Sequence, residues 1–162
     1  MEIKIKTTGL TELESRLLMA PQVVHKEIHD ALWQSLLEIE RKTKPLIPVG
    51  TGALRSSWGS PATGWKWVKG NLGSIGTNVE YAPFIEHGTG LFGPKKKMYP
   101  VAPRFKKALY WEGALHPVSG VIWQKGIKPV RFAERGTQAS LPNIKKYFDG
   151  VAEKVAIFIT KL

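Results

Sequence analysis

Apolar residues at the start of the chain follow two different spacings. Ile3 and Ile5 alternate with charged residues, which predicts a short strand that Gly9 ends. From Leu10 onward leucines recur at helical spacing until Pro21 interrupts the pattern. We therefore expect a strand and a short helical stretch here, with Pro21 in the first turn of the helix that follows.

A longer amphipathic helix is predicted over roughly 22–43. Its apolar residues, three or four positions apart, are Val24, Ile28, Leu32, Leu36 and Ile39. Pro45 and Pro48 follow its end, because proline does not continue a helix. Trp33 and Leu37 widen the apolar face, so this helix is expected to be covered on more than one side.

The middle of the chain has a different character. Short runs rich in aromatic and β-branched residues are separated by Gly, Pro and Asn, which is typical of strands. They read WKWV (65–68), LGSIGTNV (72–79), MYPVAP (98–103), KALYW (107–111) and GVIWQK (120–125). We expect them to form a mostly antiparallel sheet of about four to six strands.

A second helix is predicted after Pro142. Its apolar positions are Ile144, Phe148, Val151, Val155, Phe158 and Leu162. The order of helix, strands and helix indicates an α+β fold, with the long helix of the N-terminal half and the C-terminal helix packed on one face of the sheet. A length of 162 residues suits a single domain, 1–162. Residues 90–104 include five Gly or Pro, so we expect a long, basic, flexible loop there.

The charge of the chain restricts the kinds of molecule that it is expected to bind. The chain has 24 Lys and Arg against 13 Asp and Glu, a net charge of +11. Residues 41–133 hold 15 of the basic residues and only three acids, Glu80, Glu86 and Glu112. This segment is therefore the basic surface, which suits nucleic acid or another acidic partner. A basic surface that only confers solubility is an equal alternative, since many small basic proteins bind no nucleic acid.

Other features restrict chemistry and location. The chain has no cysteine, which excludes disulfides and thiolate metal sites. No apolar run approaches the roughly 20 residues that span a bilayer, and the first residues do not resemble a signal peptide. We therefore expect a soluble protein that is made in the cytoplasm and has no membrane partner.

The stretch YAPFIEHGTGLFGPKKK, residues 81–97, matches two phosphate-binding patterns by letter. Gly88, Gly90 and Gly93 give G-x-G-x-x-G, and a lysine follows two positions after the last glycine. A dinucleotide site needs a helix directly after the glycines, and a Walker-type loop needs lysine directly after the last one. Pro94 occupies that position and lacks the N–H that a phosphate cradle uses. We therefore expect no nucleotide site and no cofactor.

Candidate catalytic and metal-binding groups are weak. His25 and His29 lie one helical turn apart, but Lys26 stands where the zinc-protease motif has glutamate. A third ligand is not evident, so we interpret the pair as solvated side chains. The sequence has no G-x-S-x-G motif for a serine nucleophile, and its isolated carboxylates are more simply salt-bridge partners. These observations favour a protein that is not an enzyme and holds no metal.

Clustered cations are a stronger signal. Between His87 and Trp111 the basic residues are Lys95, Lys96, Lys97, Arg104, Lys106 and Lys107, with no acid among them. Lysines without a reading helix suit phosphate contacts and not base recognition, so these residues are expected to face a DNA path or an acidic partner. The tryptophans can stack on bases, but core or interface positions are their commoner use.

Residues 81–90 also predict a short helix. Pro83 suits its first turn, and Gly88 suits the left-handed position that ends a helix. Its apolar side is formed by Tyr81, Phe84 and Ile85. Glu86 is expected either to accept backbone N–H groups or to pair with Arg55.

Three segments resemble one protein family. PVGTGALRSSW (48–58) is similar to the Pro-x-x-Thr-Gly-x-Leu-Arg-x-Ser stretch of tail-completion, or head–tail joining, proteins of long-tailed bacteriophages, which include minor tail protein Z-like components. IGTNVEYAPFIEHGTG (75–90) resembles the Gly-x-x-x-x-Tyr-Ala-x-x-x-Glu-x-Gly-Thr signature of this family, and GIKPVRFAERG (126–136) resembles its Pro-x-x-Phe segment. Val49-Gly50 stands where the family often has Val-Asp.

The resemblance implies a structural virion protein of the head–tail connector, the neck or the upper tail. Such proteins form rings, usually six-fold, around the path of the genome, and no enzymatic activity is implied. The expected partners are other copies of the chain, neighbouring connector, tail-terminator or tail-tube proteins, and non-specific DNA in the lumen. The residues expected at the oligomer or partner interface are Tyr81, Phe84, Glu86, Leu91 and Phe92. A stand-alone basic nucleic-acid-binding protein is the alternative.

Overall fold

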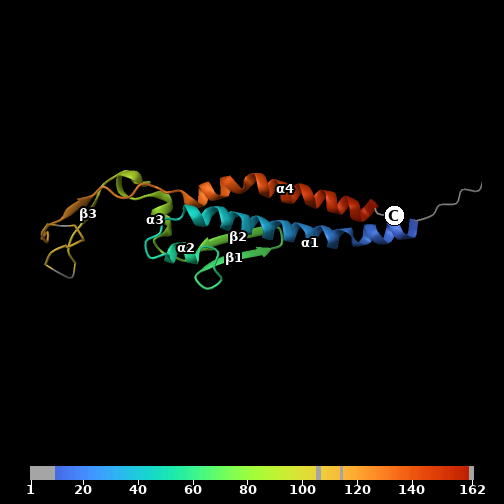
Figure 1. Cartoon of the computed structure of the whole chain (residues 1–162), viewed down its shortest axis with the longest axis horizontal. Helices are drawn as coiled ribbons and strands as arrows, with labels where there is room; N and C mark the ends of the chain where they lie inside the picture. Colours follow the sequence, from blue (N-terminus) through green and yellow to red (C-terminus); the bar gives the residue numbers. More distant parts are fainter. Residues whose placement is uncertain (1–9, 105–106, 114, 161–162) are drawn as a thin grey trace, which may run out of the picture. The chain divides into compact units, whose positions relative to one another are not determined.

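The computed structural model describes residues 10–104, 107–113 and 115–160 (Figure 1). In chain order the elements are the helix α1 (Leu10–Thr43), the 3-10 helix η1 (Lys44–Leu46), the helix α2 (Ala53–Ser57), the strands β1 (Gly64–Lys69) and β2 (Leu72–Thr77), the helix α3 (Ala82–His87), the 3-10 helix η2 (Gly90–Phe92), the strands β3 (Tyr99–Val101) and β4 (Ile122–Gln124), and the helix α4 (Phe132–Thr160). The chain forms two compact units: unit 1 contains the chain up to Asn78 and from Glu134 onward, and unit 2 contains Val79–Ala133. The strand expected around Ile3 and Ile5 lies outside the described residues.

Unit 1 has three layers. Its central layer is α1, which lies between the β1–β2 hairpin and α4 (Figure 1). The two strands are antiparallel, with Trp65 opposite Gly76. On the side of the hairpin that faces α1, the Lys66 ammonium forms an ion pair with Glu40 and lies 5.5 Å from the centre of the Trp33 ring. Charge as well as packing therefore holds the hairpin on α1.

Side-chain hydrogen bonds join α4 to the opposite side of α1. Asn143 Nδ2 donates to Glu38 Oε1 at 2.7 Å, and Lys154 Nζ donates to Glu27 Oε2 at 2.8 Å. Hydrogen bonds from Arg41 and Asn143 hold the pKa of the Glu38 carboxyl below its usual value. The later residue on α4 pairs with the earlier residue on α1, so the two helices run antiparallel.

Both long helices extend further than the sequence predicts. The helix α1 continues through Pro21, so the expected interruption there is wrong. The helix α4 begins at Phe132 instead of after Pro142, which lies inside it. Phe132, Gly136 and Ser140 recur every four residues and are all buried. Burial of this face stabilises the first turns of the helix, so α4 begins before Pro142 and not after it.

The strands form two separate antiparallel pairs, which corrects the expectation of a single larger sheet. In the described residues β1 pairs only with β2, and β3 pairs only with β4. The KALYW run contributes an isolated bridge between Leu109 and Val118. The α+β class is confirmed. However, α4 packs on α1 and not on a sheet face shared with α1 (Figure 1).

Candidate assembly surface

The short helix α3 forms where the sequence predicts it. Pro83 lies in its first turn, where a missing N–H has no intrahelical partner to lose, and Ala82 N–H donates to the Val79 carbonyl at 3.0 Å. Tyr81 is the N-cap residue, and Gly88 ends the helix with φ 74° and ψ 173°. The positive φ explains why glycine occupies this position, since glycine adopts such angles more readily than other residues. The ψ value is extended, so the left-handed helical conformation predicted for Gly88 is wrong.

The glycine-rich turn after α3 brings two backbone segments into contact. Thr89 and Leu91 donate their N–H groups to the carbonyls of Ile127 and Lys125, at 2.9 and 2.8 Å. A β-carbon on Gly90 would be 2.3 Å from the Lys125 carbonyl oxygen. Real β-carbons do not approach this closely, so the turn depends on glycine to reach the residues before α4.

The backbone N–H groups that follow are used within the turn. Phe92 donates to the Thr89 carbonyl at 3.2 Å, Gly93 to the Gly90 carbonyl at 3.3 Å, and Lys96 to the Gly93 carbonyl at 3.1 Å. A phosphate cradle needs such groups unpaired and pointing at one centre. The glycines of residues 88–93 therefore allow close packing of the backbone. This packing explains why the segment matches the two phosphate-binding sequence patterns.

Glu86 binds the first turn of α4. Its Oε2 accepts the Ala133 N–H at 3.0 Å, and its carbonyl accepts the Arg131 N–H at 3.2 Å. Next to it, the Ile85 carbonyl accepts the Val130 N–H at 2.9 Å. Of the two roles expected for Glu86, acceptance of backbone N–H groups is confirmed. A carboxylate there also faces the positive end of the helix dipole, which stabilises both.

The apolar residues expected at an interface are exposed. Tyr81, Phe84, Leu91 and Phe92 expose 42%, 56%, 42% and 41% of their surface. Lys128 Nζ lies 5.8 Å from the centre of the Phe92 ring. The backbone that carries these side chains is held by the hydrogen bonds of the turn, so it presents them from fixed positions.

Unit 2 also contains an apolar groove of about 820 Å³. Its apolar lining includes Pro83, Phe84, Pro94, Met98 and Tyr99, and His87, Lys95 and Lys97 also line it. The groove thus brings Phe84 together with two of the expected basic residues. Met98 and Tyr99 are lining residues that the sequence interpretation placed only in a strand. An apolar pair directly after a lysine run is the signal that could have identified them.

The basic residues expected to face DNA or an acidic partner are exposed where the structure describes them. These are Lys95, Lys96, Lys97, Arg104 and Lys107. Lys106 lies outside the described residues. Lys96 has φ 47°, in the left-handed region that side chains seldom adopt. Residues 90–104, expected as a flexible loop, contain η2 and β3 joined by turns.

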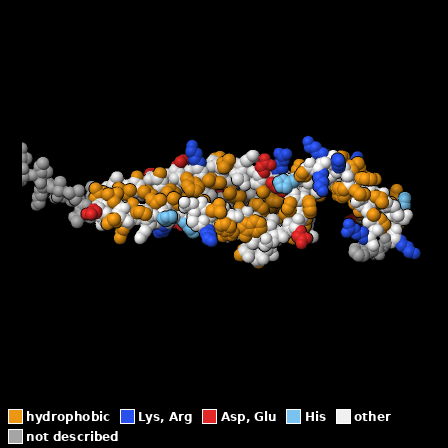
Figure 2. Space-filling view, turned by 180° about the vertical axis from the view of Figure 1, so that it is seen from behind, with side chains coloured by type: hydrophobic (Ala, Val, Ile, Leu, Met, Phe, Trp, Pro, Cys, Tyr) orange, Lys and Arg blue, Asp and Glu red, His pale blue; other side chains and the backbone are white. Residues whose placement is uncertain are grey.

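Unit 1 exposes apolar side chains as well. Figure 2 shows hydrophobic side chains spread along one face of the helices. Leu17, Leu18 and Met19 expose 51%, 76% and 58% of their surface. On the face of the hairpin that points away from α1, Trp65 and Trp67 expose 37% and 41%. The sequence located these aromatics in a strand but did not distinguish the covered face from the exposed one.

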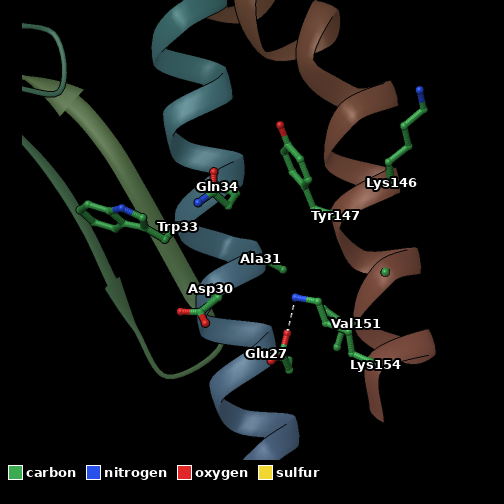
Figure 3. Close-up of a pocket in the computed structure, with 10 residues that line it drawn as sticks. Glu27, Asp30, Ala31, Trp33, Gln34, Lys146, Tyr147, Val151 and Lys154 are labelled. Atoms are coloured by element: carbon green, nitrogen blue, oxygen red, sulfur yellow. Dashed lines mark hydrogen bonds and ion pairs between the residues drawn. The ribbon is translucent and has the colours of Figure 1, made fainter. Parts of the chain in front are cut away.

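A second, more polar groove of about 600 Å³ lies between α1 and α4 in unit 1. Figure 3 shows the Glu27–Lys154 pair crossing it, with Tyr147 and Gln34 further along. The charged side chains that line it are Glu27, Asp30, Lys146 and Lys154, and its lining contains no serine or histidine. His29 is exposed elsewhere, with Nδ1 3.7 Å from Asp30 Oδ1.

Within the described part of the chain, no three metal-ligating side chains gather in one place. No helix of that part is long and apolar enough to cross a membrane.

Comparison with known proteins supplies the family. Residues 11–88 match the model of the HK97-gp10-like family, which is described as "Bacteriophage HK97-gp10, putative tail-component". This segment of the chain is similar to that family. The match runs from the start of α1 to the glycine that ends α3. Of the three segments that carry the resemblance, it includes the whole of 48–58 and all but the last two residues of 75–90. The description of the family names a tail component of a phage, which implies a place in the virion. No curated protein and no solved structure matches the chain.

Proposed function

We propose that the protein is a ring subunit of the head–tail connector or upper tail of a phage, which joins or completes the tail and surrounds the DNA path. The match of residues 11–88 to a family of tail components carries this proposal. The function is assembly and not catalysis. The structure contributes surfaces that suit a subunit surrounded by neighbours.

The first support is the small amount of apolar surface that the chain buries by itself. Among the described residues the buried apolar ones are Ala31, Leu36, Ile47, Leu54, Trp58, Ala82 and Phe132. Many larger apolar side chains are exposed in both units, including Leu18 at 76% and Trp123 at 62%. Exposed apolar patches mark sites of protein interaction, so neighbouring subunits are the expected cover.

The second support is charge. Residues 41–133 carry 15 basic residues and three acids, and Lys95, Lys96 and Lys97 are exposed. In a ring these lysines would be repeated around one axis. Unless they contact phosphate or an acidic partner ring, they would repel one another. Duplex DNA that passes through the ring would meet the basic residues that neighbouring subunits leave uncovered, without being read in sequence.

Electron microscopy tests this proposal directly. Purified protein should form rings at high concentration, and particles from phage that lack the gene should contain heads and tails that fail to join. A variant with Lys95, Lys96 and Lys97 changed to Gln should fold, because the three side chains are exposed. Normal joining by phage without the protein would contradict the proposed role.

A stand-alone nucleic-acid-binding protein is the second candidate. The observation that favours it is the combination in unit 2 of basic residues with exposed aromatics, among them Tyr110 at 70% and Trp123 at 62%. Such side chains stack on single-stranded bases. Tight binding of DNA by the monomer, falling steeply with salt, would support this candidate over the ring.

A further inference from the structure

The apolar groove of unit 2 is large enough to accept side chains from one face of a helix. Phe84 on α3 and Tyr99 on β3 expose 56% and 41% of their surface, and both line this space of about 820 Å³. Pro83 and Pro94 add rigid walls. A groove of this size accepts several aliphatic side chains, and amphipathic helices bind such grooves through anchors at i, i+3, i+4 and i+7.

The charges at the groove restrict what can bind there. Lys95 and Lys97 line it, together with His87, and its lining contains no acid. A bound helix therefore gains if it carries a carboxylate beside its apolar anchors, and it loses if it carries a cation there. The binding partner should thus combine aliphatic side chains with at least one acid on the same face.

The start of α1 has this combination. Glu14, Leu17, Leu18 and Pro21 follow the i, i+3, i+4, i+7 spacing, so they share one face of the helix. All four are exposed, and Leu17 and Leu18 expose 51% and 76% of their surface. The nearby cation Arg16 is directed elsewhere, since its Nη1 donates to the Phe158 carbonyl at 3.4 Å.

We propose that Leu17 and Leu18 of one copy bind in the unit 2 groove of a second copy, with Glu14 beside Lys95 and Lys97. This inference rests on the ring proposed above. A closed ring with rotational symmetry and head-to-tail contacts needs two different complementary faces on each subunit. The groove and the start of α1 supply such a pair.

Disulfide crosslinking tests the contact, because the chain has no cysteine of its own. The double variant Leu18→Cys/Tyr99→Cys should form a ladder of crosslinked species up to the full ring when oxidised. Each single variant should stay uncrosslinked, because in a head-to-tail contact position 18 never meets position 18. The matched control is Met19→Cys/Tyr99→Cys. Met19 is also exposed, at 58%, but it lies about 100° further round the helix, so it should crosslink poorly.

A second measurement does not depend on crosslinking. At a concentration where the wild type is mostly assembled, Leu18→Asp should lower the fraction in rings by about tenfold or more, and Met19→Asp should lower it much less. Glu14→Lys should also weaken assembly, and Lys95→Glu/Lys97→Glu in the same chain should restore it.

The outcomes separate this contact from the proposed function. Rings that form without any 18–99 crosslink, or that tolerate Leu18→Asp, would overturn the contact and leave the ring intact. A disulfide within one chain, or dimers of either single variant, would also overturn it. If neither the purified protein nor the assembled particle contains rings, the proposed function fails, and this contact fails with it.

Discussion

Gly136 of α4 lies directly against Thr43 of α1. A β-carbon on residue 136 would be 2.1 Å from the Thr43 hydroxyl oxygen and 2.8 Å from the Thr43 α-carbon. Thr43 is completely buried, and so is Ser140 one turn further along α4. The two helices therefore touch through small side chains at this point, and both the short Thr43 side chain and the backbone behind it limit the space.

We expect Gly136→Ala to destabilise the protein by about 1–3 kcal/mol, because the added methyl group forces the helices apart. Chemical denaturation monitored by circular dichroism measures the change. Gly150→Ala is the matched control on the same helix, since a β-carbon there would meet nothing within 4 Å. That substitution should stabilise the helix by roughly 0.5–1 kcal/mol. Equal effects of the two changes would contradict the close contact.

Removal of the hydrogen bond between Asn143 and Glu38 should weaken the attachment of α4. Asn143 Nδ2 lies 2.7 Å from the Glu38 carboxylate, which is 5% exposed. We expect Asn143→Ala to cost about 1–3 kcal/mol, because the bond has a charged acceptor that would stay buried. Hydrogen exchange in α4 should increase before exchange in α1 does.

Stability should fall in acid partly through Glu38. Its pKa is lowered in the folded protein, chiefly by the hydrogen bonds from Arg41 and then from Asn143. The stabilisation is therefore fully present above the unfolded pKa and is lost as the pH falls through the lower folded pKa. Thermal unfolding from pH 7 to pH 3 should show a lower melting temperature at pH 7 and a shallower acid decline for Glu38→Gln. The exposed Glu153→Gln should follow the wild type, and a Glu38→Gln curve parallel to the wild type would contradict the assignment.

Glu86 should act as an internal cap. Its carboxylate accepts the Ala133 N–H at 3.0 Å, so Glu86→Ala should cost about 1 kcal/mol, as loss of a helix cap does. Glu86→Gln keeps an acceptor and should cost less. The amide of Ala133 should exchange faster in Glu86→Ala, while Glu80→Ala, at an exposed position in the same unit, should leave that exchange unchanged.

Substitutions near the glycine-rich turn after α3 can distinguish its two possible roles, close backbone packing and phosphate binding. Gly126 has φ +91°, and a β-carbon there would be 2.0 Å from the Thr89 carbonyl oxygen. We expect Gly126→Ala to destabilise unit 2 by about 1–3 kcal/mol and to expose it to proteolysis. Gly120→Ala, where a β-carbon meets nothing within 4 Å, is the control. Neither pyrophosphate nor ATP should raise the melting temperature of the wild type.

The sequence predicts local features of this fold better than boundaries and pairings. The helix α3, the hairpin strands and the two long helices all follow from residue spacing. The ends of the two long helices do not, because Pro21 and Pro142 lie inside these helices instead of at their starts. The start of α4 depends on Phe132, Gly136 and Ser140. A glycine and a serine carry no apolar signal, although their spacing of four is regular.

The pairing of β3 with β4 and the groove of unit 2 could not be predicted from the sequence for a different reason. β3 and β4 have three residues each and are separated by twenty residues of the chain, so their pairing with each other is not a local property. The lining of the groove likewise combines α3, the turn after it and β3. The glycines and prolines of residues 81–97 indicated an unusual turn. However, their spacing matched phosphate-binding motifs, whereas in the structure they allow close contacts between backbone segments.

The long-range contacts of α4 have a consequence for synthesis of the chain. Glu38 and Asn143 are 105 residues apart, and Glu27 and Lys154 are 127 apart. Glu40 and Lys66, which join α1 to the hairpin, are only 26 apart. A nascent chain can therefore dock its hairpin early, while the opposite side of α1 stays uncovered until α4 has left the ribosome. During that interval the side of α1 that α4 covers is open to chaperones and to wrong partners, so the risk of aggregation is highest before α4 is synthesised.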